Sequence, residues 1–238
     1  KLGTFSMSQL GQSKSIISDF IKSAREKNDN FEEGLLKLDP KTGKIETILR
    51  TAFSEGFKGL NDLHFAANGD LYFTDQGQTS LADPTGRLYR LRAADGRLEC
   101  LLDNVPGPNG LVLNKAENVL FLAVTRANAI WKITLLGNGE VAKVGTYIQM
   151  SGGNGPDGMA IDDDDNIAVC HVGFGAVWLF SARGEPMLRI DAPDGHMTTN
   201  CAYGGPDNKT LYITESKTGT VLSAPMPVAG RAMYSHQD

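Results

Sequence analysis

Cysteine, basic charge and long apolar runs are all scarce in this 238-residue sequence. The three cysteines, Cys100, Cys170 and Cys201, are odd in number and far apart, which excludes a disulfide framework and a Cys-x-x-Cys zinc site. With 23 basic against 28 acidic residues, the formal net charge is −5, so a dedicated nucleic-acid binder with a basic face is not expected. No apolar run approaches ~18 residues, so no membrane-spanning helix is expected either.

The composition is that of a folded protein in a reducing compartment. Hydrophobic residues make up 41% and charged residues 21%, which excludes a disordered or collagen-like chain. The length allows one large domain or two small ones. The sequence begins with Lys1 and shows no signal peptide, and its unpaired cysteines suit reduced thiols, so we expect a cytoplasmic protein whose true N-terminus lies outside this sequence.

An internal repeat organises most of the chain. Four tetrads place Asn or Asp directly before an apolar strand, at intervals of 48, 48 and 43 residues. Each tetrad is followed by a polar turn, a second apolar strand, a third strand that begins near Gly or Asn, and in most units a more polar fourth strand. The tetrads are Leu60-Asn61-Asp62-Leu63, Pro108-Asn109-Gly110-Leu111, Pro156-Asp157-Gly158-Met159 and Thr199-Asn200-Cys201-Ala202.

Four short strands in about 45 residues are typical of a β-propeller blade. A β-sandwich also contains many short strands, but it does not predict the same Asn or Asp at the head of each unit. We therefore predict a single propeller domain over residues 1–238, with a partial blade at 13–49 and blades that start near 59, 107, 155 and 198. Residues 21–33 are predicted to be a polar insertion, and the last blade has no evident fourth strand.

The tetrads and their glycine-rich flanks resemble the senescence-marker-protein, gluconolactonase and luciferin-regenerating-enzyme-like family. The similarity covers essentially residues 16–227, and its strongest segments are 59–62, 106–111, 153–158 and 199–205. It implies an all-β, six-bladed propeller whose N-terminal part is missing from this chain. It also implies that the N-terminal segment closes the ring beside the last blade.

In that family one divalent cation sits at the end of the central channel. The resemblance places metal ligands at Asn109 and Asp157, while Asn61 either ligates the metal or faces the substrate. Amide and carboxylate oxygens suit calcium best, with magnesium, manganese and zinc as alternatives. The family's glutamate at the head of its first blade has no match here, and we expect it in the missing N-terminal part.

The reaction that the resemblance implies is the ring-opening hydrolysis of a sugar-type or related lactone. A bound cation polarises a carbonyl, and Asp157 can act as the general base or as the nucleophile because it is the only charged member of the three. Asn200 and Arg126 are candidates for substrate contact, although a solvated loop position would explain Arg126 equally well. The lone histidines His64 and His171 are interpreted as structural groups.

Two other functions stay open. An organophosphate-type phosphotriesterase would use the same metal site, because a metal polarises C=O and P=O bonds alike. A ligand-binding propeller without chemistry would explain the missing glutamate if the chain were complete. The expected partner is a small-molecule lactone, with no nucleic acid or membrane, and the expected oligomeric state is a monomer or homodimer.

Overall fold

The computed structural model describes residues 3–6, 34–39 and 41–234. Expectations for residues 7–33, among them the start of the partial blade and the polar insertion, lie outside the described residues. The regular secondary structure of the described residues is β-strand, apart from a short 3-10 helix, η2 (Thr125–Ala127). Within this part of the chain, no helix has the length and apolarity to cross a membrane.

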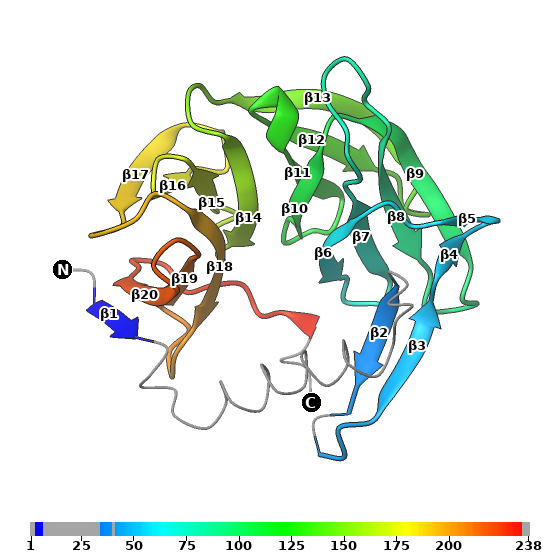
Figure 1. The fold of residues 1–238 in the computed structure, drawn as a ribbon, viewed down its shortest axis with the longest axis horizontal. Helices are drawn as coiled ribbons and strands as arrows, with labels where there is room; N and C mark the ends of the chain where they lie inside the picture. Colours follow the sequence, from blue (N-terminus) through cyan, green and yellow to red (C-terminus); the bar gives the residue numbers. More distant parts are fainter. Residues whose placement is uncertain (1–2, 7–33, 40, 235–238) are drawn as a thin grey trace.

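Four antiparallel four-stranded sheets stand around a common axis like propeller blades (Figure 1). Blade I contains β6 (Leu60–Phe65), β7 (Leu71–Asp75), β8 (Gly86–Leu91) and β9 (Leu98–Val105). Blade II contains β10 (Pro108–Leu113), β11 (Val119–Val124), β12 (Ala129–Leu135) and β13 (Val141–Gln149). Blade III contains β14 (Gly155–Ile161), β15 (Ile167–Val172), β16 (Ala176–Phe180) and β17 (Pro186–Asp191). Blade IV contains β18 (Thr198–Gly204), β19 (Thr210–Glu215), β20 (Thr220–Pro225) and β1 (Gly3–Ser6). An all-β propeller of four-stranded blades is thus confirmed, and the described residues form four such blades rather than six.

Two hairpins precede blade I along the chain. β2 (Leu35–Leu38) pairs with β3 (Ile45–Leu49), where the sequence predicts the third and fourth strands of a partial blade. β4 (Thr51–Ala52) pairs with β5 (Glu55–Gly56). Both hairpins are fixed to the ring by a shared apolar cluster with blade I, whose buried members are Leu35, Ala52, Leu71, Phe73 and Tyr89.

In blades II and III the three inner strands are mostly buried and the outer strand is the most exposed. In blade II every residue of β10 is buried, whereas most of the outer strand β13 is half-buried or exposed. Strands covered on both faces need apolar side chains on both, which explains the nearly continuous apolar runs of the inner strands. Apolar clusters fill the spaces between neighbouring blades; Leu88 of blade I, for example, belongs to one cluster with Leu122 of blade II.

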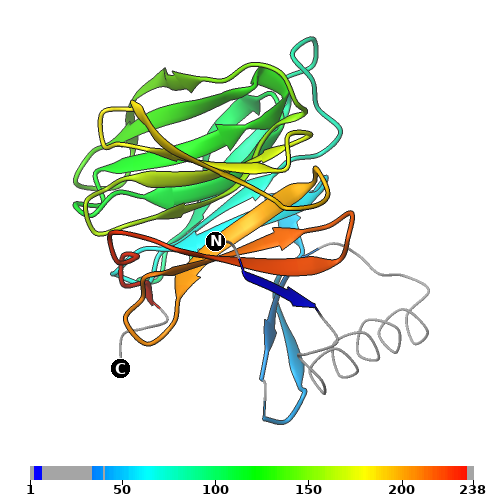
Figure 2. The same cartoon turned by 90° about the vertical axis from the view of Figure 1, so that its left-hand side faces the viewer.

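The last blade takes its fourth strand from the beginning of the chain. β1 pairs antiparallel with β20, with Gly3 opposite Ser223 and Ser6 opposite Thr220 (Figure 2). The expectation that the N-terminal segment lies beside the last blade is confirmed. The expectation that this blade lacks a fourth strand is wrong, because the strand comes from the opposite end of the sequence.

Acidic turn residues tie blade II to blade I and blade III to blade II. Glu117 and Asp165 both occupy the left-handed region, with φ of 53° and 61°. Glu117 accepts the backbone N–H of Ala67 in blade I at 2.9 Å, and Asp165 accepts that of Lys115 in blade II at 2.6 Å. The same type of hydrogen bond, from a backbone N–H to an acidic turn residue, therefore joins blades I, II and III at the ends of their inner strands.

The last described residues cross the middle of the ring (Figure 1). The Arg231 backbone N–H donates to the Ile161 carbonyl at 3.1 Å, and its guanidinium pairs with Glu117 at 2.8 Å. The Tyr234 ring stacks on Phe65, with the ring centroids 5.3 Å apart. The C-terminal segment thus contacts blades I, II and III at one end of the axis.

Candidate functional site

Each inner strand carries a register shift at the same level of the axis. Bulges break the alternation of a strand, re-aim its side chains and are common next to active sites. Here they fall within the four repeated tetrads, so the repeat marks one functional level of the propeller. The residues within the shifts are Asn61 and Asp62, Asn109 and Gly110, Asp157 and Gly158, and Thr199.

Asn109 and Asp157 meet between blades II and III. The Asn109 side chain is buried and hydrogen-bonds to the Asp157 carboxylate. Burial raises the pKa of Asp157 to about 6; the Asn109 hydrogen bond opposes this shift, and the charge of Asp62 adds to it. A carboxylate with this pKa is mostly ionised at neutral pH and is a competent proton acceptor.

A second carboxylate, that of Asp62 in blade I, faces the same place. Its Oδ1 accepts the backbone N–H of Leu63 at 2.9 Å, and its Oδ2 accepts that of Leu111 in blade II at 3.3 Å. Burial also raises the pKa of Asp62. Three consecutive blades therefore present two carboxylates and one amide at one level.

Glycines allow the inner strands to approach each other closely here. A Cβ at Gly110 would lie 2.5 Å from the carbonyl oxygen of Asp157. A Cβ at Gly158 would lie 2.1 Å from Oδ1 of Asn200. A larger residue at either position would separate the strands that carry the polar side chains.

Asn200 lies one register position away from its expected place. Its backbone N–H donates to Oγ1 of Thr214 at 2.9 Å, just as that of Asp62 donates to Oγ1 of Thr74 at 3.0 Å. Asn200 therefore corresponds to Asp62, and Thr199 corresponds to Asn61, Asn109 and Asp157 of the other blades. The expected equivalence was wrong by one residue because the extra residue of the β18 bulge precedes Asn200.

Asn61 and Arg126 are both exposed. The Asn61 amide donates to Oε1 of Gln76 at 3.4 Å. The next residue of β6, Asp62, is the one whose charge acts on Asp157. Arg126 lies in η2, whose first residue, Thr125, donates to the carbonyl of Pro156 at 2.7 Å. Arg126 is thus attached to the loop that leads into the bulge of blade III.

Buried polar residues at the ends of the second strands hold the loops that lead into the inner strands. Asp75 and Glu215 each accept a backbone N–H from the loop of their own blade, at 2.7 Å in both cases. His171 Nε2 lies 3.1 Å from the Gly152 carbonyl, which can only accept, so Nε2 carries the proton. Burial lowers the pKa of His171, and the neutral ring serves this loop contact.

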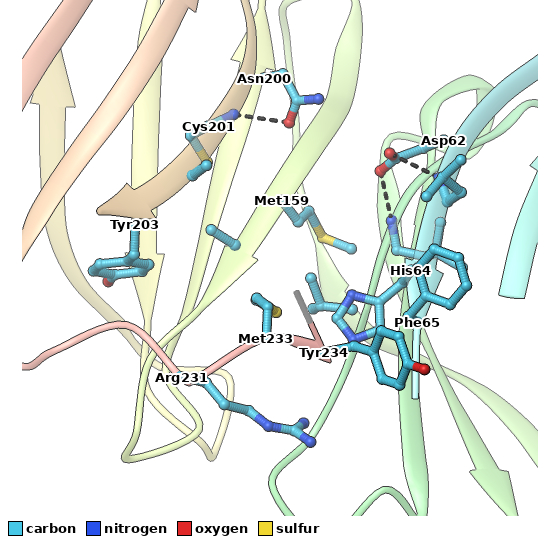
Figure 3. A pocket seen from close by; sticks show the side chains of 15 residues that line it. Asp62, His64, Phe65, Met159, Asn200, Cys201, Tyr203, Arg231, Met233 and Tyr234 are labelled. Atoms are coloured by element: carbon cyan, nitrogen blue, oxygen red, sulfur yellow. Dashed lines mark hydrogen bonds between the residues drawn. The ribbon is translucent and has the colours of Figure 1, made fainter. Parts of the chain in front are cut away.

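A cavity of about 340 Å³ lies on the axis, between the bulges and the C-terminal segment (Figure 3). Asp62 and Asn200 line one end of it, and Arg231 and Tyr234 line the other. His64 also lines the cavity, and its pKa is lowered to about 4, first by burial and then by the charge of Arg231. His64 is therefore neutral at physiological pH.

A family model described as the SMP-30/Gluconolactonase/LRE-like region matches residues 30–217. The chain belongs to this family. A lactonase, drp35, of Staphylococcus aureus strain MW2 is 34% identical over 145 residues, which are 58% of this chain and 44% of the relative. Lactonase drp35 of Staphylococcus epidermidis is 32% identical over 190 residues, which are 76% of this chain and 57% of the relative. The chain thus spans about half the length of the curated relatives it matches.

Two solved structures, named regucalcin and gluconolactonase, have the same fold. Regucalcin, a calcium-binding protein of Agrobacterium tumefaciens, superposes with a TM-score of 0.72 and 24% identity over 85% of this chain and 72% of its own. A gluconolactonase of Xanthomonas campestris superposes with a TM-score of 0.70 and 20% identity over 82% of this chain and 66% of its own. At these identities the likeness shows the propeller fold of this SMP-30/gluconolactonase member.

The oxygen donors at the bulges fit a divalent cation. In the described part of the chain, no group of three His, Cys, Asp or Glu side chains is placed to hold a metal. Sequence reasoning missed Asp62 because Asn61 matched the tetrads better. The sequence does show that Asp62 follows Asn61, at the position where the next two tetrads have Gly110 and Gly158. This difference could have pointed to Asp62.

Proposed function

We propose that this family member is a metal-dependent hydrolase that opens a sugar-type or related lactone on a six-bladed propeller. The observation that carries the proposal is the meeting of Asp157, Asn109 and Asp62 at one level of the axis. Relatives named lactonase and gluconolactonase support the substrate class. The four described blades, with the β2–β3 hairpin as part of a further one, are compatible with six.

Asn109 and Asp157 would hold one divalent cation through their side-chain oxygens. Calcium suits an all-oxygen donor set, and a calcium-binding regucalcin shares the fold. When bound, the cation polarises the lactone carbonyl and stabilises the charge that develops on its oxygen. Asp62 adds a second negative charge beside this position, and Asn61 remains a candidate for a further ligand or a substrate contact.

Asp157 accepts the proton of the water that attacks the lactone carbonyl carbon. The water oxygen forms the new C–O bond, the ring C–O bond breaks, and the released alkoxide takes up a proton to give a hydroxy acid. Asn109 orients the Asp157 carboxylate through its hydrogen bond, and the charge of Asp62 keeps that carboxylate basic. Asn200 and Arg126 are the proposed substrate contacts on either side.

Replacement of the proposed base is the direct test. Asp157→Asn should lower kcat for gluconolactone hydrolysis by about a thousandfold with an unchanged melting temperature, because the amide cannot accept the proton. Asp164→Asn, in an exposed turn, is the matched control and should retain full activity. Retained activity in Asp157→Asn would remove this residue from the mechanism.

Calcium binding is tested separately by isothermal titration calorimetry. The unmodified protein should bind one calcium ion, and Asp157→Asn should bind it at least about tenfold more weakly because a charged ligand is lost. If the unmodified protein bound neither calcium nor another divalent cation, the metal-dependent mechanism would be refuted.

A further inference from the structure

Two buried cysteines meet between blades III and IV. Cys170 lies on β15 and Cys201 on β18, and both belong to one apolar cluster between the two blades. The Cys201 thiol lies 3.8 Å from the carbonyl of Ala168, two residues before Cys170 on the same strand. Cys170 and Ala168 lie on the same face of β15, so the two thiols are near enough to act on each other electrostatically. They therefore form a pair across the blade interface, although 30 residues separate them in the sequence.

The two members of the pair differ in access. Cys201 lines the axial cavity directly beside Asn200, whereas Cys170 is fully buried (Figure 3). Burial, together with the neighbouring thiol, raises the pKa of Cys170 well above its usual range, so this thiol stays protonated. A small oxidant that enters the cavity therefore reaches Cys201 first.

We propose that Cys170 and Cys201 are an oxidisable dithiol that reacts with a small hydroperoxide and closes to a disulfide between blades III and IV. Cys201 attacks the peroxide oxygen, the O–O bond breaks, and a sulfenic acid and water (or an alcohol, from an alkyl hydroperoxide) are formed. The Cys170 sulfur then attacks the Cys201 sulfur, its proton leaves with the hydroxide as water, and the S–S bond forms. The peroxide is thereby reduced by the two electrons that the thiols lose.

The disulfide would act on the neighbouring site as well. An S–S bond of about 2.04 Å is much shorter than a thiol–thiol contact, so its formation pulls β18 toward β15. Cys201 follows Asn200, whose side chain packs against Gly158 next to Asp157. Oxidation should therefore lower lactone hydrolysis, and this consequence, unlike the disulfide itself, rests on the proposed function.

The chemistry is tested by mass spectrometry on native protein treated with hydrogen peroxide. A Cys100→Ser background removes the exposed third cysteine, which would otherwise form disulfides between molecules. We expect the loss of two hydrogen atoms from the intact mass and recovery on reduction with dithiothreitol. Because Arg183 and Arg189 lie between the two cysteines, trypsin should release them as two peptides joined by the disulfide.

Single replacements check the order of events. Cys170→Ala should stop the oxidation at a Cys201 sulfenic acid, which dimedone traps, whereas Cys201→Ala should leave Cys170 unmodified in the folded protein. Native protein that keeps both thiols free under peroxide, or that forms only intermolecular disulfides, would overturn the proposal. Disulfide formation without any lactonase activity before or after treatment would count against the proposed function and not against the dithiol.

Discussion

Acid should destabilise this propeller through one buried side chain, His64. The folded-state pKa of His64 is about 4, against about 6.5 in an unfolded chain, because burial and the charge of Arg231 disfavour the imidazolium. Above about pH 6.5 the side chain is neutral in both states and has no effect. As the pH falls toward 4, the unfolded state takes up a proton that the folded state does not, so stability is lost.

The size of this loss follows from the two pKa values. Between about pH 7.5 and pH 4.5, the linkage relation gives about 2.5 kcal/mol of lost unfolding free energy from His64 alone. His64→Gln is neutral throughout this range and should remove that part of the pH dependence. His196→Gln, at an exposed position, is the control and should leave it unchanged.

Urea unfolding at the two pH values, followed by circular dichroism, measures the effect for each variant. The decisive quantity is the drop in unfolding free energy between the two pH values, compared between His64→Gln and the unmodified protein. Equal drops would refute the reasoning, because they would mean that His64 can be protonated within the folded structure at little cost.

Two further substitutions probe the site and the fold. Gly158→Ala should lower kcat by about a hundredfold, because its Cβ would lie 2.8 Å from the Cα of Asn200 and must displace a strand. The control Gly145→Ala, whose Cβ has no neighbour within 4 Å, should keep its kcat, and equal activities of the two variants would count against the close packing. Arg90→Met should lower the free energy of unfolding in urea by about 3–5 kcal/mol, because the buried Asp70 carboxylate loses the guanidinium whose Nε donates to it at 2.9 Å. A change below about 1 kcal/mol would show that the ion pair adds nothing to stability.

The sequence predicted the blades well because their signals are local. Each inner strand follows a tetrad, and each hairpin turn carries glycine, Asn or Asp, so strand starts can be located within a short window. The fourth strand of blade IV was missed for the opposite reason. It comes from Gly3–Ser6, and no local pattern near Pro225 can announce a strand supplied by the other end of the chain.

The candidate site was predicted less precisely than the fold. Asn109 and Asp157 stand between Pro and Gly in corresponding tetrads, and the structure brings them into contact. A bulge, however, inserts one residue into the alternation, so the side chain that faces the axis cannot be chosen from sequence spacing alone. Within the bulge of β6, Asn61 and Asp62 both remain possible contributors, and in β18 the extra residue puts Thr199, and not Asn200, in register with Asn61.

The same bulges explain why the polar side chains meet between blades II and III. The position after Asn109 and after Asp157 is glycine, while blades I and IV carry Asp62 and Asn200 at the equivalent position. The Asp62 carboxylate accepts the backbone N–H of Leu111, which follows the glycine of blade II, and Asn200 packs on the glycine of blade III. Blades II and III are therefore flanked at this level by one polar side chain on each side. Only the flank from blade I is charged, so the pKa of Asp157, which is raised mainly by burial, is raised further by a charge on one side only. A pattern that looks like a simple repeat therefore encodes a directional site, because two of its four copies exchange glycine for a side chain.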